Sequence, residues 1–200
     1  MPLSFGVTFD YRCPFARNAH EYVVAGLRSG AEWDVSFVPF SLSQAKVEHG
    51  DPPVWDDPTK DSGLLAMQYA LAVRDTQPDA FLDAHVALFG LRHDQAGDLR
   101  DEDSVRAALV DAGVDWDAAK AEVASGLPLK TVRAEHEKGV AESTVWGVPT
   151  FIAGGHAAFV RLMDRPRDEA HDPVKVVERL VGLLDGWPEL NEFKHTSLDR

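Results

Sequence analysis

The chain has 200 residues, of which 44% are hydrophobic, and a formal net charge of −13 at pH 7. An acidic chain of this kind repels phosphate backbones, which argues against nucleic acid as a partner. No stretch reaches the roughly 18–20 apolar residues that cross a membrane, and the N-terminus lacks the basic segment of a signal peptide. We therefore expect no membrane partner and a cytoplasmic location. The single cysteine excludes an intramolecular disulfide and a cysteine-based zinc site.

The first forty residues have the pattern of a β-α-β unit. The apolar and aromatic run Ser4–Phe9 predicts a strand. Pro14–Arg28 has apolar residues at helical spacing, begins with a proline that suits a first helical turn, and precedes Gly30, a typical helix stop. Trp33–Phe40 then alternates as a second strand. Units of this kind are right-handed and place their two strands parallel.

A helical block follows a loop rich in proline, aspartate and glycine, Ser43–Lys60. The spacing of apolar residues predicts four helices in this block: Ser62–Asp75, Asp79–Asp94, Glu102–Ala112 and Trp116–Ala124. Leu127-Pro128 breaks the run, and a longer helix, about Leu129–Ser143, comes next.

The C-terminal third returns to strand. Val148–Ala153 and His156–Val160 predict two strands, and Gly154-Gly155 between them is a strong hairpin signal. Pro173–Leu184 predicts a final amphipathic helix. A tail follows, and we expect its large apolar residues to pack on the body: Trp187, Leu190 and Phe193.

The order of elements is βαβ, a helical block, and then α-ββα. This order predicts an α/β protein with a four-stranded mixed sheet and an all-helical insertion. We assign residues 1–58 and 127–200 to the sheet domain and residues 59–126 to the insertion.

Cys13 lies where the first strand meets the first helix. The positive end of a helix and its unpaired N–H groups stabilise a thiolate. A pKa of ~6 would need about 3.4 kcal/mol relative to the ordinary ~8.5, and the helix end supplies at most about 2 kcal/mol. We expect Arg12 and Arg17 to supply the rest, with Asp10 opposing them. The alternatives are a small buried hydrophobe for Cys13 and solvated surface charges for the two arginines.

Two motifs resemble those of the DsbA-like family of thioredoxin-fold proteins. Phe9-Asp10-Tyr11-Arg12-Cys13-Pro14-Phe15-Ala16 resembles its active-site motif, and Trp146-Gly147-Val148-Pro149-Thr150-Phe151 resembles its loop with a cis proline. The predicted insertion between the motifs is also similar to that of the family. The resemblance implies a thioredoxin-like fold with the backbone of Val148 beside Cys13. It also implies a substrate surface formed by Pro14, Phe15, Arg17, Trp146, Val148 and Pro149.

The chain departs from the family motif at Ala16, which stands where the second cysteine of Cys-Pro-x-Cys would be. A dithiol enzyme resolves its own mixed disulfide, and this chain has no thiol to do so. We therefore expect a monothiol reaction that an external low-molecular-weight thiol completes, with mycothiol or glutathione as co-substrate and no tightly bound cofactor. His85 and His93 lack a carboxylate at metal-ligand spacing, so we expect no metal site. His20 lies two turns along the helix from Cys13, which is too far for it to act as the base of that thiol.

Within the family, the chain resembles the cytosolic bacterial branch. This branch includes 2-hydroxychromene-2-carboxylate isomerases, kappa-class glutathione transferases and mycothiol-dependent nitroreductases. Three hypotheses stay open: a monothiol oxidoreductase, an isomerase or transferase that uses a bound small thiol, and a non-catalytic binding module. The partner would be a small thiol or small molecule, or a protein disulfide. The sequence leaves open whether the protein is a monomer or a homodimer.

Overall fold

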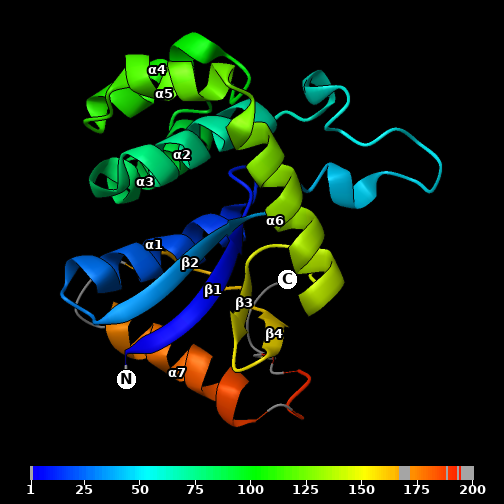
Figure 1. Cartoon of the computed structure of the whole chain (residues 1–200). Helices are drawn as coiled ribbons and strands as arrows, with labels where there is room; N and C mark the ends of the chain where they lie inside the picture. The colour runs from blue at the N-terminus through cyan, green and yellow to red at the C-terminus, as the bar shows by residue number, and fades with distance from the viewer. Residues whose placement is uncertain (1, 167–171, 188, 193, 195–200) are drawn as a thin grey trace.

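The structure, a computed structural model, describes residues 2–166, 172–187, 189–192 and 194. It contains the predicted four-stranded mixed sheet, with strand order β2-β1-β3-β4 (Figure 1). The strands are β1 (Leu3–Phe9), β2 (Trp33–Pro39), β3 (Thr150–Ala153) and β4 (His156–Phe159). β1 pairs in parallel with β2 and antiparallel with β3, and β3 and β4 form the predicted hairpin.

β1 is a central strand, and its composition reflects that position. Phe5, Val7 and Phe9 are at most 3% exposed. Val7 lies opposite Phe37 of β2 and opposite Phe151 of β3. A strand covered on both faces favours such a continuous apolar run over strict alternation. The end of β1 at Phe9 therefore lies in the interior, and the chain that follows it carries Cys13.

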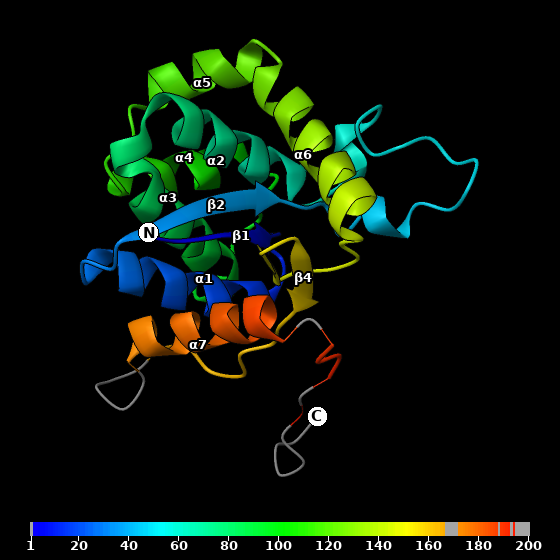
Figure 2. The same ribbon diagram turned by 60° about the horizontal axis from the view of Figure 1, so that its bottom comes forward.

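Helices α1 (Pro14–Arg28) and α7 (Pro173–Gly186) cover one face of the sheet (Figure 2). Pro14 lies in the first turn of α1, as expected, and Gly30 follows the helix with a φ of +91°. The Asp172 carboxylate accepts hydrogen bonds from the first N–H groups of α7. This cap fixes the start of α7, whose last turn extends two residues beyond the predicted end.

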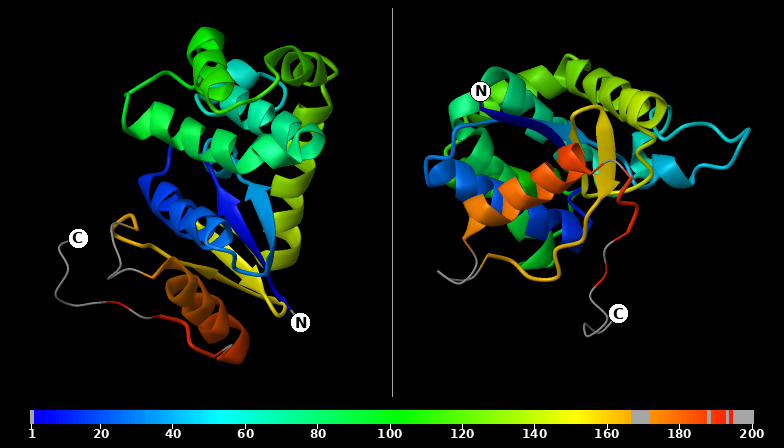
Figure 3. Two further views of the ribbon diagram at one scale, coloured as in Figure 1. Left: turned by 90° about the vertical axis from the view of Figure 1, so that its left-hand side faces the viewer. Right: turned by 90° about the horizontal axis from the view of Figure 1, so that it is seen from below.

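The remaining helices form a block on the other side of the strands, and α3 also packs against α1 (Figures 2 and 3). They are α2 (Leu64–Thr76), α3 (Pro78–His93), α4 (Glu102–Asp111), α5 (Trp116–Ala124) and α6 (Leu127–Ser143). α6 starts at Leu127 and not at Leu129, because Pro128 occupies its first turn and therefore begins the helix. Gly126, with a φ of +76°, separates α5 from α6.

The predicted loop Ser43–Lys60 contains two short 3₁₀ turns, Gln44–Lys46 and Pro58–Lys60, and projects from the body (Figure 1). The predicted packing of the tail is wrong for the residues that can be checked. Trp187 is 60% exposed and Leu190 is 46% exposed, and Phe193 lies outside the described residues. No helix in the described part of the chain is both long enough and apolar enough to cross a membrane.

Candidate active site

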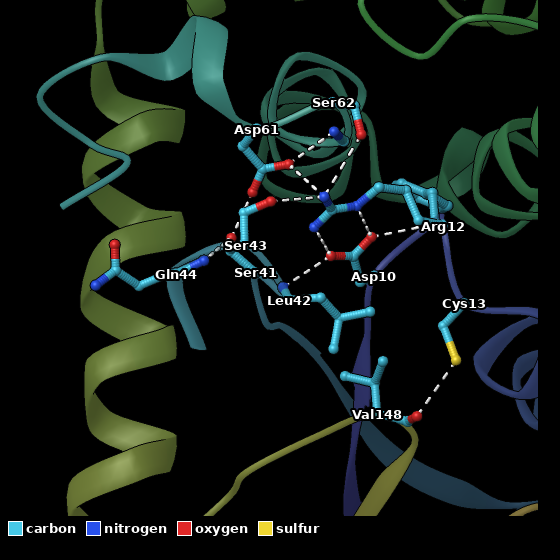
Figure 4. A network of polar contacts seen from close by, with 12 residues as sticks. Asp10, Arg12, Cys13, Ser41, Leu42, Ser43, Gln44, Asp61, Ser62 and Val148 are labelled. Atoms are coloured by element: carbon cyan, nitrogen blue, oxygen red, sulfur yellow. Dashed lines mark hydrogen bonds and ion pairs between the residues drawn. The ribbon is translucent and has the colours of Figure 1, made fainter. Parts of the chain in front are cut away.

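Cys13 is the N-cap residue of α1, with extended backbone angles of φ −90° and ψ 117°. Its Sγ accepts a hydrogen bond from the N–H of Ala16 at 3.4 Å, and its S–H donates to the carbonyl oxygen of Val148 at 3.4 Å (Figure 4). The thiol is half-buried. It therefore lies between the positive end of a helix and the loop that precedes β3.

That loop is held against the end of β1. The Val148–Pro149 peptide bond is cis. The N–H of Thr150 donates to Oγ1 of Thr8 at 2.8 Å, and Oγ1 of Thr150 donates to the carbonyl oxygen of Gly147 at 2.8 Å. Val148 is 2% exposed and Pro149 is buried. The side chains of Val148 and Pro149 are therefore not available to a molecule that binds at Cys13, and the Val148 carbonyl oxygen faces the Cys13 Sγ.

The predicted low pKa of Cys13 is wrong in direction. Burial raises the pKa of the Cys13 thiol, and the Asp10 carboxylate raises this pKa further. The N–H groups of Ala16 and Phe15 act in the opposite sense but do not outweigh burial. At neutral pH the resting side chain is therefore a thiol, in agreement with its hydrogen bond to the Val148 carbonyl oxygen.

Arg12 does not act on Cys13 because its charge is neutralised by two buried carboxylates. Its Nε donates to Asp10 at 2.9 Å, its Nη1 lies 3.2 Å from Asp61, and both carboxylates have 0% side-chain exposure. Nη1 also donates to Oγ of Ser43 at 2.7 Å. Figure 4 shows the guanidinium turned toward this cluster and the Cys13 Sγ turned toward Val148.

Arg17 also forms ion pairs with carboxylates and not with Cys13, which contradicts its expected action on the thiol. Its Nε donates to Glu21 at 2.9 Å, its Nη2 donates to Asp94 at the end of α3, and its side chain is 9% exposed. Arg165 also contacts Glu21 and Asp94, at 2.5 and 3.7 Å. Arg17 therefore ties α1 to α3 and has no free charge to offer to a substrate.

A row of aromatic rings begins at Phe15, two residues after Cys13, and ends at Trp146. Trp146 is 68% exposed, and its ring centroid lies 4.5 Å from that of Phe159. The Arg161 guanidinium lies 5.4 Å from the ring centroid of Phe15 and 6.0 Å from that of Phe159. Pro14 is exposed beside Phe15. The structure thus places Phe15 and Trp146, both predicted substrate contacts, at the two ends of a row that also includes Phe159 and Arg161. We call these four residues the aromatic row.

Several of these residues were not predicted from the sequence. Phe159 ends β4, and Arg161 follows it by two residues. Side chains two residues apart in extended chain lie on the same face, and this spacing is the only local signal for the pair. Asp61 has no local signal, because it comes from the loop before α2. His85 and His93 do not share a ligand in the structure: His85 bonds to Tyr11 and His20, and His93 bonds to the carbonyl oxygen of Tyr11. No group of three or more metal-ligating side chains occurs among the described residues.

Comparison with known proteins identifies a family for this chain. The model of the family described as "DSBA-like thioredoxin domain" matches residues 7–168. No curated protein is similar enough in sequence to match.

Solved structures of similar fold include proteins from three bacteria. Reduced DsbA1 from Neisseria meningitidis has a TM-score of 0.61 and 16% identity, with 92% of this chain and 85% of that chain covered. The oxidoreductase MdbA from Actinomyces oris has a TM-score of 0.60 and 20% identity, with coverages of 90% and 81%. The thiol-disulfide exchange protein α-DsbA2 from Wolbachia pipientis has a TM-score of 0.59 and 16% identity, with coverages of 91% and 81%. At these identities the likeness establishes the fold.

Proposed function

The chain belongs to the family of DsbA-like thioredoxin domains, and from this premise we propose that it is a thiol–disulfide oxidoreductase with one catalytic cysteine, Cys13. The observation that carries the proposal is the position of the thiol at the N-terminus of α1, 3.4 Å from the carbonyl oxygen of Val148. Two proteins of similar fold are described as a thiol-disulfide exchange protein and a thiol-disulfide oxidoreductase.

The proposed reaction has two exchanges. The Cys13 thiol first loses its proton to solvent, and its hydrogen bond to Val148 is released. The thiolate, which accepts the N–H of Ala16, attacks one sulfur of a disulfide. The S–S bond breaks, one thiolate leaves, and a mixed disulfide forms on Cys13. A thiol from another molecule then attacks this mixed disulfide and restores Cys13.

The pKa of Cys13 determines the rate of this exchange. A cysteine at the ordinary ~8.5 is only a few per cent thiolate at neutral pH, and burial makes the fraction at Cys13 smaller. For each unit of pKa the thiolate fraction falls about tenfold, while the thiolate becomes only about threefold more reactive. We therefore propose a slow exchange at neutral pH that accelerates as pH rises toward the pKa of Cys13.

The proposal includes the source of the second thiol. A low-molecular-weight thiol such as mycothiol or glutathione would release the mixed disulfide, and the first disulfide would be that of a small molecule or of a protein. A cytoplasmic location would suit this cycle, because the cytoplasm holds reduced small thiols.

Trapping of the intermediate tests the proposal. The protein is incubated with oxidised glutathione, and its intact mass is measured before and after reduced glutathione is added. We expect one glutathione adduct that the reduced thiol removes, and no adduct on the Cys13→Ser variant. Absence of an adduct on the folded protein at alkaline pH would refute the proposal.

A second candidate is favoured by the protonated state of Cys13. A neutral thiol that donates a hydrogen bond could hold the thiolate of a bound small thiol, as an isomerase or a glutathione-type transferase would require. A hydroxyl can replace a thiol in that role. Cys13→Ser would then retain turnover, whereas it would abolish turnover in the oxidoreductase. A non-catalytic binding module would show neither turnover nor an adduct.

A further inference from the structure

The aromatic row joins the two halves of the candidate site. Trp146 precedes the loop with the cis proline, Phe159 ends β4, and the ring of Phe15 lies in the first turn of α1, two residues after Cys13. The Arg161 guanidinium contacts the rings of both Phe15 and Phe159. A molecule whose sulfur reaches Cys13 therefore has this row beside it.

The segment that carries Arg161 is fixed at both ends. On one side, the N–H of Val160 donates to the carbonyl oxygen of Pro149 at 3.0 Å. On the other side, the Asn18 side chain donates to the carbonyl oxygen of Leu162 at 2.8 Å. These bonds attach the segment both to the loop before β3 and to α1. The row is thus preorganised, and binding would not require the segment to become ordered.

Arg161 differs from the other arginines near Cys13 in that its charge is available. Arg12 and Arg17 are held by buried or partly buried carboxylates. Within the described residues, Arg161 forms neither an ion pair nor a hydrogen bond with a carboxylate, and its side chain rests on aromatic faces. A guanidinium stacked in this way keeps its N–H edge free for an anion.

We propose that the aromatic row recognises a negatively charged aryl group on the disulfide or thiol that reacts at Cys13, and that Arg161 determines this specificity. The inference rests on the proposed function and names its substrate class. The exposed indole of Trp146 supplies a face for an aromatic ring, and the Arg161 guanidinium supplies two parallel donors for a carboxylate or sulfonate on that ring. In a chain of net charge −13, this local cation would offset the general repulsion of an anion.

Three disulfide probes separate charge from aromaticity. These are 5,5′-dithiobis(2-nitrobenzoate), which is aromatic and anionic, 4,4′-dithiodipyridine, which is aromatic and neutral, and 3,3′-dithiodipropionate, which is aliphatic and anionic. With each probe the Cys13 thiolate attacks one sulfur, the probe's S–S bond breaks, one thiolate leaves and the thiol proton goes to solvent. The second-order rate constant is measured for each probe with the folded protein.

We expect Arg161→Gln to lower the rate constant for the anionic aromatic probe about five- to tenfold and to leave the neutral aromatic probe nearly unchanged. Trp146→Ala should slow both aromatic probes and spare the aliphatic one. Arg106→Gln, which removes one exposed charge on α4, is the matched control and should leave all three rates within about twofold, because a distant surface charge is screened.

The outcomes distinguish failure of the proposed specificity of the aromatic row from failure of the proposed function of Cys13. Equal effects of Arg161→Gln and Arg106→Gln on the anionic aromatic probe would overturn the role of Arg161. An equally large effect of Arg161→Gln on the aliphatic probe would overturn the aromatic requirement and favour a site for any acidic disulfide, including an acidic peptide. If Cys13 reacts with none of the probes, the proposed oxidoreductase function itself fails.

Discussion

The phenol oxygen of Tyr11 lies 2.7 Å from Nδ1 of His85, and both side chains are completely buried. Nε2 of His85 lies 2.8 Å from Nδ1 of His20, whose Nε2 lies 3.1 Å from the carbonyl oxygen of Thr8. A carbonyl oxygen only accepts, so Nε2 of His20 carries its proton and Nδ1 must accept from His85. Nδ1 of His85 then accepts from Tyr11. Every donor in this chain therefore points the same way, from the loop next to Cys13 back to β1.

Tyr11→Phe should destabilise the fold by about 1–3 kcal/mol, because it leaves Nδ1 of His85 buried without a donor. The matched control is Tyr69→Phe, which removes a hydroxyl that bonds to Glu102, a partly exposed carboxylate. Water can replace that hydroxyl, so this variant should cost less than about 1 kcal/mol. Urea unfolding measures both free energies. Equal losses for the two variants would mean that the buried hydrogen bonds from Tyr11 to His85 and His20 add no more stability than one exposed hydrogen bond.

Stability should fall as pH drops below about 6.5, the ordinary pKa of histidine. Burial lowers the pKa of His20 to about 4, that of His136 to about 4, and that of His85 well below its ordinary value. Between pH about 6.5 and these lowered pKa values, the histidines of the unfolded chain bind protons that those of the native protein do not. Each ring therefore removes up to about 1.4 kcal/mol of stability per pH unit across this interval.

Urea unfolding at a series of pH values from about 7.5 to 4.5 checks this dependence. Carboxylates titrate mostly below this interval, so the slope there reports the histidines. The free energy of unfolding should be constant in the upper part of the series and decline through the lower part. A flat profile across the whole series would show that the buried rings are already protonated or accessible to water in the native protein.

The sequence predicted the frame of the site better than its electrostatics. Pro14 after Cys13 and the Gly154-Gly155 turn are local signals, and they located the helix start and the β3–β4 hairpin. The expected action of Arg12 on Cys13 failed for two reasons: Asp10, two residues away, binds the guanidinium itself, and its second partner, Asp61, lies in a different segment, before α2.

The error for Arg17 has the same origin. Glu21, four residues along α1, is a local partner of Arg17. Its other partner, Asp94, follows α3, and only the packing of α3 on α1 brings Asp94 to Arg17. The raised pKa of Cys13 follows from the same packing, since burial is its largest cause. Local patterns establish which residues lie at a junction, and tertiary contacts decide which charges remain free there.

Asp10→Asn should lower the pKa of Cys13. The Asp10 carboxylate raises that pKa, and its removal also leaves Arg12 with one less anion. An asparagine oxygen can still accept from the N–H of Leu42, which donates to Asp10 at 2.9 Å. The rate of alkylation of Cys13 against pH gives the pKa, and the midpoint should move to lower pH.

Asp34→Asn serves as the control for this variant, because Asp34 is an exposed carboxylate on β2. Its removal should leave the alkylation midpoint unchanged, since solvent and salt screen a distant exposed charge. Thermal unfolding of both variants verifies that they fold. A midpoint that stays in place or rises in Asp10→Asn would contradict the electrostatic account of Cys13.

Ala16→Cys should convert the proposed monothiol reaction into a dithiol reaction. Ala16 lies in the first turn of α1, and its N–H donates to the Cys13 Sγ at 3.4 Å, so a thiol on this residue would lie beside that sulfur. After treatment with oxidised glutathione, the introduced thiol should displace glutathione from Cys13 and form an internal disulfide. Intact mass should show no adduct, and thiol titration should find no free thiol.

The matched control is Ala19→Cys, which also adds a thiol to a completely buried alanine of α1. This residue lies almost two turns from Cys13, about 9 Å along a helix, which is beyond the reach of a disulfide. Its glutathione adduct on Cys13 should therefore persist until a small thiol is added. An adduct that persisted equally in Ala16→Cys would contradict the prediction. It would show that the lack of a second cysteine is not the reason that the chain needs an external thiol.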